Sequence, residues 1–143
     1  MDWSRALEVD LTTVPPRVDI LKIVLHHLVD SMKQLTPRRK DIHCTIDNHI
    51  DIALICQMVE HGAITREDMA ALVDFCFKHI KRLQCPNDDR RTGEWHDRVH
   101  AAMAADEFSA ATFFSVFLKD TMDMVSRIHE QINAFHAKFN KHT

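Results

Sequence analysis

Two histidines and an acid in the second half of the chain have the spacing of metal ligands. His96 and His100 are four residues apart, so on a helix both rings face the same side, and Asp97 precedes His100 by three residues. An acid three residues before a histidine is a pattern that carboxylate-bridged metal centres use in helical bundles. A metal-binding bundle that uses His96, His100 and acids from facing helices is therefore one hypothesis for this protein.

The other histidines do not complete such a site in the sequence. Among the 11 histidines, His43 lies four residues before Asp47, and His129 lies seven before His136. A di-iron bundle needs matching ligand motifs on at least two further helices, and the chain shows neither these nor the HExxH motif of zinc peptidases. Solvent-facing or locally paired histidines explain the pattern better, and we expect no bound metal and no cofactor.

Catalytic fingerprints of other kinds are missing from the sequence. Cys76 lies between two phenylalanines on an apolar stripe, whereas a reactive thiolate needs an exposed, electropositive setting. No serine occupies a Gly-x-Ser-x-Gly turn, and only two glycines are present, too few for a glycine-rich phosphate loop. The four cysteines lack CxxC spacing and suit reduced, buried thiols. We expect no catalytic residues, and a protein that is not an enzyme.

A charged segment is the first candidate for contact with a partner. Asp88, Asp89, Arg90 and Arg91 follow Pro86 in what we expect to be a loop. Local ion pairing and capping of the next helix explain these charges. The alternative is a docking loop, because arginine can bind a carboxylate or a phosphate through two parallel hydrogen bonds.

The elements that carry these groups are predicted to be helices. Apolar residues recur at three- and four-residue spacing along most of the chain, which is typical of amphipathic helices. Thr65 and Asp68 predict a capping box at the start of the central helix, and Gly62 predicts the end of the helix before it. We expect one domain over 1–143, an all-α bundle of about five helices within 17–139, and a short helix or arm over 1–14. The predicted helices cover 17–35, 38–61, 65–84, 94–105 and 110–139.

The predicted helix 110–139 is longer than the others. Its apolar residues alternate between spacings of four and three, which forms a seam for packing against other helices. In a bundle of ordinary height, Phe135 and Phe139 pass beyond the core and form an exposed apolar patch, a feature that marks interfaces in soluble proteins. A homodimer through this helix is therefore a further hypothesis.

The central helix and its borders carry a pattern that resembles a known family. Glu60 to Ile64 read Glu-His-Gly-Ala-Ile, an amphipathic helix follows, and a stop with Cys85, Pro86 and Asp88 ends it. This order is similar to that of the T-complex protein 11 family, whose pattern is a His-Gly-Ala-Leu turn, one helix and a Leu-Cys-Ala-Pro-x-x-Asp stop. The similarity covers pieces of residues 18–132, including Met122 to Val125, and family members are usually several times longer.

The resemblance implies a function as well as a fold. It implies a non-enzymatic helical domain in intracellular signalling, which in that family is associated with cyclic-AMP and protein-kinase-A pathways. It supplies no catalytic residues to carry over to this chain.

Composition narrows the choice of partners. The net charge of −3 gives no general attraction to nucleic acids, whose binding domains tend to show a strong basic patch. The sequence contains no run of about 18 apolar residues that could span a membrane. Its first ten residues lack the apolar core of a signal peptide. We therefore expect a cytoplasmic protein that binds other proteins, without nucleic-acid binding and without a membrane span.

Overall fold

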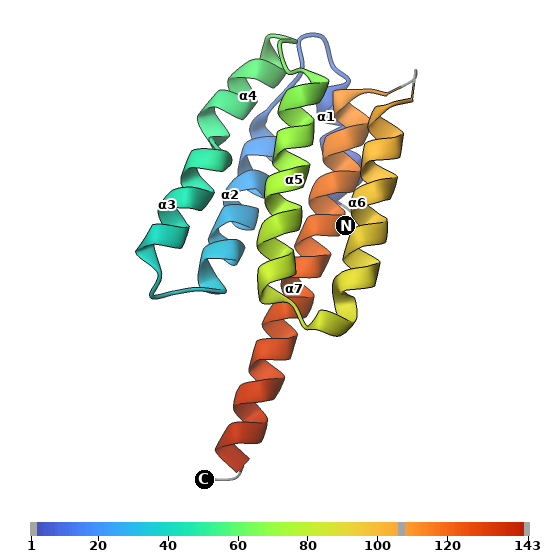
Figure 1. Ribbon diagram of the computed structural model, residues 1–143. Coiled ribbons are helices and arrows are strands. Elements are labelled where there is room, and N and C mark those ends of the chain that lie inside the picture. Colours follow the sequence, from blue (N-terminus) through green and yellow to red (C-terminus); the bar gives the residue numbers. More distant parts are fainter. Residues whose placement is uncertain (1–2, 106–107, 142–143) are drawn as a thin grey trace.

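The computed structural model describes residues 3–105 and 108–141. Over these residues the chain forms α-helices and one 3₁₀ turn and no strand, which confirms the prediction of an all-α bundle (Figure 1). The elements are α1 (Trp3–Leu11), α2 (Asp19–Gln34), α3 (Lys40–His49), α4 (Ile52–Glu60), α5 (Arg66–Leu83), the 3₁₀ turn η1 (Pro86–Asp88), α6 (Asp89–Met103) and α7 (Ala110–Lys141).

Helix α7 is the element against which most of the bundle packs. It contacts α1, α2 and α5, while α6 lies along α5, and α3 and α4 pack on α2 (Figure 1). The centre of the core is formed by the first half of α7, where Phe114 and Leu118 are fully buried. The C-terminal end of α7 continues past the ends of the other helices (Figure 1).

The predicted borders of the central helix are confirmed. Gly62 has a positive φ of 65°, the left-handed conformation that lets the chain leave α4. The hydroxyl of Thr65 accepts from the backbone N–H of Asp68 at 3.1 Å, and the Asp68 carboxylate accepts from the Thr65 N–H at 2.9 Å. Ser109 also caps α7, because its Oγ accepts from the Thr112 N–H at 3.2 Å. Side chains thus satisfy backbone N–H groups that a helix start leaves unpaired.

The prediction of one helix over 38–61 was wrong. The chain forms α3 and α4 instead, with a break at Ile50 and Asp51. The Asp51 carboxylate accepts from the Leu54 N–H at 3.1 Å and so caps a new helix start. This break gives six α-helices where five were predicted beyond residue 17, and α1 brings the number in the described residues to seven.

The prediction of a charged loop before a helix at 94–105 was also wrong. Asp88 ends η1, and α6 begins at Asp89, so Arg90 and Arg91 lie in the first turn of a helix. The start of α6 is held to the end of α5, because the hydroxyl of buried Thr92 donates to the side chain of Gln84 at 2.7 Å.

The N-terminal segment is a helix that belongs to the bundle. Leu7 on α1 is fully buried, and α1 packs on α7, so of the two alternatives for 1–14 the structure shows the short helix. Residues 1–2 of that segment lie outside the described residues. Among the helices described, none combines the length and the apolar character needed to cross a membrane.

Candidate functional site

Helices α5 and α6 lie side by side and bring three potential metal ligands to one place. Asp74 on α5 follows Val73, which is fully buried, and His96 on α6 follows Trp95, which is nearly so. One position after a buried residue, a side chain lies at the flank of its helix, next to the neighbouring helix. His100 is one turn after His96 and reaches the same place. The packing of two amphipathic helices therefore positions the three side chains.

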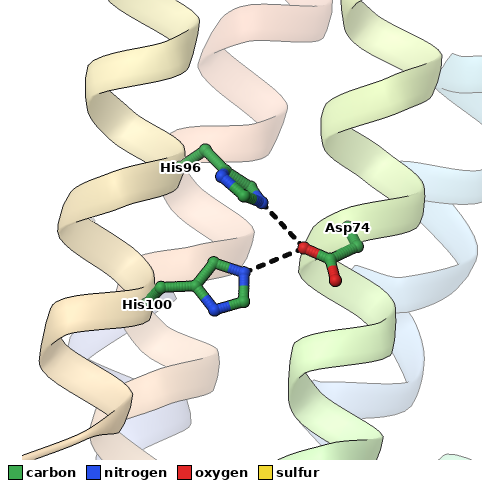
Figure 2. Close-up of side chains that lie close together, drawn as sticks. All are labelled: Asp74, His96 and His100. Carbon is green, nitrogen blue, oxygen red and sulfur yellow. Dashed lines mark hydrogen bonds and ion pairs between the residues drawn. The ribbon is translucent and has the colours of Figure 1, made fainter.

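The three side chains converge on a single oxygen atom. The Nε2 of His96 lies 2.7 Å from Oδ1 of Asp74, and the Nε2 of His100 lies 2.8 Å from the same oxygen (Figure 2). The carboxylate can accept an N–H from each ring. All three ligand atoms lie within 4.8 Å of one another, the only such trio of histidine, cysteine or acidic residues in the part of the chain that the structure describes.

The cluster is partly open to solvent. The side chain of His96 is 23% exposed, that of His100 37% and that of Asp74 47%. The ring of His96 stacks on Phe77 with centroids 4.2 Å apart, and the His100 ring is tilted against it at 4.4 Å. Stacking holds the inner ring in place while one side of the cluster stays accessible to water.

The charge of Asp74 is set by opposing effects. Partial burial acts to raise the pKa of Asp74, but the hydrogen bonds from His96 and His100 outweigh it and leave that pKa below its ordinary value. The carboxylate is therefore ionised at neutral pH, the form that accepts hydrogen bonds and binds cations.

The structure rearranges the ligand set that the sequence suggested. Asp97 is exposed, and its nearest oxygen lies 3.9 Å from Nδ1 of His96, on the ring nitrogen opposite Asp74. Asp74 takes the place expected of a nearby acid, although it lies 22 residues before His96 in the chain. The only sequence signal for Asp74 is an acid that adjoins the buried stripe of the central helix.

The other histidine pairs considered from the sequence do not form sites. His43 bonds the backbone oxygens of Lys33 and Thr36, while Asp47 pairs instead with the side chain of Lys33 at 2.8 Å. His129 bonds the backbone oxygen of Ser31 at 3.0 Å. These rings connect neighbouring elements of the bundle.

Asp88, predicted as a weak partner-binding residue, is tied into the fold. Arg127 of α7 donates to it through Nε and Nη2 at 3.0 and 3.1 Å, and Gln131 donates through Nε2 at 2.7 Å. Arg127 and then Gln131 hold the pKa of Asp88 below its ordinary value. Its side chain is only 11% exposed, so it offers little surface to a partner.

The other three charges of that segment differ in their accessibility. Asp89 accepts from Gln84 at 2.8 Å, and Arg90 pairs with Glu94 at 3.2 Å along α6. The side chains of Arg90 and Arg91 are exposed. A docking role for this segment stays a prediction, and it would fall to the two arginines.

The far end of α7 places Phe135 and Phe139 in solvent. They are 67% and 63% exposed, on the part of the helix that passes beyond the bundle (Figure 1). The predicted exposure is confirmed, and the interface that it suggests stays a prediction.

Two surface hollows lie elsewhere. A groove of about 570 Å³ between α3 and α5 is lined by His49, Phe75, Lys78 and Arg82, and by His79, whose Nε2 is buried without a hydrogen-bond partner. Burial, and then the charge of Arg82, lower the pKa of His79. A smaller hollow of about 300 Å³ between α6 and α7 is mainly aromatic and aliphatic.

Comparison with known proteins leaves the geometry as the basis for a functional assignment. No protein-family model, no curated protein and no solved structure matches the chain. The resemblance to the T-complex protein 11 family accordingly stays a prediction from the residues that carry it.

Proposed function

We propose that this chain is a non-enzymatic interaction domain of intracellular signalling that pairs with a second copy of itself through the far end of α7. The observation that carries the proposal is the exposure of Phe135 and Phe139, 67% and 63%, on a helix that passes beyond the bundle. Exposed large apolar residues grouped on one helix face are costly in water, and contact with a partner removes that cost.

The arrangement of the apolar residues favours a second copy over another partner. Phe135 and Phe139 are four residues apart on an exposed part of α7, whereas Ile128 is 2% exposed and belongs to the core of the bundle. In an antiparallel pair centred at residue 137, Phe135 of each helix faces Phe139 of the other. A two-fold pair needs such a self-complementary surface, and two-fold dimers are the commonest protein oligomers.

The size of this surface indicates a weak dimer. A phenylalanine buries about 150–250 Å² when it is fully covered. Phe135 and Phe139 are 67% and 63% exposed, so the four phenylalanines of a pair contribute about 400–650 Å². Stable specific interfaces bury about 1,200–2,000 Å² in total. We therefore expect a reversible dimer whose population depends on protein concentration, a property suited to regulation.

Analytical ultracentrifugation over a wide range of protein concentration tests the dimer. The native chain should shift from monomer to dimer as concentration rises, and the double variant Phe135→Ser, Phe139→Ser should stay monomeric. Ile23→Ser is the matched control, because Ile23 is 68% exposed on α2, away from the α7 end. A native chain that stays monomeric throughout would rule out self-pairing.

The signalling part of the proposal is supported by the T-complex protein 11 resemblance and needs its own test. Titration calorimetry of the purified chain against the regulatory and catalytic subunits of protein kinase A would measure direct binding. Saturable binding supports a place in that pathway. No heat and no complex with either subunit would remove the proposed link to protein kinase A, whatever the oligomeric state.

A further inference from the structure

We infer that Asp74, His96 and His100 form a binding site for one divalent transition-metal ion, with Zn²⁺ as the best fit, held between α5 and α6. The inference is independent of the pairing of α7. It starts from three ligand atoms on two helices that already lie within 4.8 Å of one another, two of them 2.7 and 2.8 Å from the third (Figure 2).

The distances allow an ion to enter with small side-chain movements. Zinc binds nitrogen and oxygen at about 2.0–2.2 Å in a tetrahedron, so its ligand atoms lie about 3.3–3.5 Å apart. Each Nε2 must therefore move away from Oδ1 of Asp74 by about 0.5–0.8 Å. Rotation of partly exposed side chains provides such a movement, so the backbones of α5 and α6 can stay as they are.

The chemistry of the ligands selects the class of metal. Two imidazole nitrogens with one carboxylate suit zinc and neighbouring transition metals, whereas Ca²⁺ and Mg²⁺ require mostly oxygen ligands. The three protein ligands leave one tetrahedral position open. Because the three side chains are 23–47% exposed, water can reach that position.

Asp97 has a defined role in this arrangement. When Nε2 of His96 binds a metal ion, the ring must carry its proton on Nδ1. An oxygen of Asp97 lies 3.9 Å from that Nδ1, and rotation of this exposed side chain brings it within hydrogen-bond distance. Carboxylates that accept from the distal nitrogen of a metal-bound histidine fix its tautomer and orientation. Asp97 is thus a positioning residue, not a ligand.

The cluster is expected to contribute little to the stability of the fold. Hydrogen bonds among half-exposed charged and polar groups contribute little to stability, since water competes for each group. Yet the stacking of His96 on Phe77, at 4.2 Å, holds one ring firmly toward the carboxylate. Metal binding requires ligand side chains that packing holds in place and that an ion can reach from solvent.

Titration calorimetry with Zn²⁺ on the reduced, full chain tests the inference. We expect one tight site per chain. Asp74→Asn and His100→Ala should weaken it by at least about 100-fold, because the loss of an outer-shell partner alone costs about 10- to 100-fold. His27→Ala is the control, because His27 is an exposed histidine on α2 and its loss should leave the tight site unchanged.

Two further measurements separate this site from binding elsewhere. Co²⁺ in place of zinc should give the visible absorption of a tetrahedral nitrogen and oxygen site, without the charge-transfer band of a bound thiolate. Asp97→Asn should weaken Zn²⁺ binding by about tenfold. The inference is wrong if the native chain binds no Zn²⁺, or if Asp74→Asn and His100→Ala bind it as tightly as His27→Ala while circular dichroism shows all to be folded.

Discussion

Two aspartates in this bundle are held in the same way, but their partners differ in chemistry. Asp74 accepts from His96 and His100, four residues apart on α6, and Asp88 accepts from Arg127 and Gln131, four residues apart on α7. In both places one helix presents two donors, one turn apart, to an acid from another element. The side chain of Asp88 is 11% exposed and that of Asp74 is 47% exposed.

The comparison shows that geometry alone does not define a site. Guanidinium and amide groups donate hydrogen bonds permanently, so the contact of Asp88 can only join η1 to α7. An imidazole can instead offer a nitrogen lone pair, so the contact of Asp74 can be replaced by bonds to a metal ion. Burial adds to the difference, because the side chain of Asp74 is far more exposed to solvent than that of Asp88.

The largest expected difference between the two aspartates is their response to zinc. A metal that binds only the folded chain, at 100 times its dissociation constant, stabilises it by about 2.7 kcal/mol. We expect Zn²⁺ to raise the melting temperature of the native chain and of Asp88→Asn, but not that of Asp74→Asn. Calorimetric melting with and without the metal measures this, and a shift retained in Asp74→Asn would contradict it.

Replacement of the buried Asp88 should lower the free energy of unfolding more than replacement of the more exposed Asp74. Asp88→Ala leaves the donors of Arg127 and Gln131 without their acceptor, and we expect a loss of about 1–2 kcal/mol in the free energy of unfolding after allowing for solvent at the half-exposed arginine. Urea unfolding in the presence of a chelator measures it. Asp97→Ala is the control, because that exposed acid should change stability very little.

Lowering the pH should remove the contribution of Asp88 to the free energy of unfolding. Its pKa is lowered in the folded chain by Arg127 and Gln131, so its stabilisation is present above the ordinary carboxyl pKa and is lost as pH falls through the lowered value. Asp88→Asn should therefore flatten the acid side of the curve of unfolding free energy against pH. An identical slope in the variant and the native chain would show that Arg127 and Gln131 do not stabilise the ionised form of Asp88.

The smallest effect is expected for Asp74 without metal. With a chelator present, Asp74→Asn should change the free energy of unfolding by less than about 1 kcal/mol, because water replaces the bonds of a half-exposed group. A loss as large as that of Asp88→Ala would mean that the histidine cluster is mainly a structural contact.

Local patterns were the part of the fold that sequence could predict. The capping box of Thr65 and Asp68, the turn at Gly62 and the exposure of Phe135 depend on residues a few positions apart or on helix length. The break at Asp51 was missed because apolar residues on both sides continue a helical pattern. The carboxylate of Asp51 caps the start of α4 and so favours a new helix at this point.

The candidate site was predicted only in half. The spacing of His96 and His100 is visible along one helix, but Asp74 comes from α5, and only the packing of α5 on α6 brings it to them. The same limit applies to Asp88, whose partner Arg127 lies 39 residues further along the chain. Contacts between helices depend on tertiary packing, which residue spacing does not specify.

The central position of α7 has a consequence for the time at which the domain can fold during synthesis. Helices α1, α2 and α5 pack on α7, so the parts of their apolar faces that contact α7 stay uncovered until that helix has been made. At about 5–20 residues per second, its 32 residues take about 2–6 seconds to add. During that interval the growing chain exposes apolar surface, and a nascent chain stopped before Ala110 should depend on chaperones to stay free of aggregation.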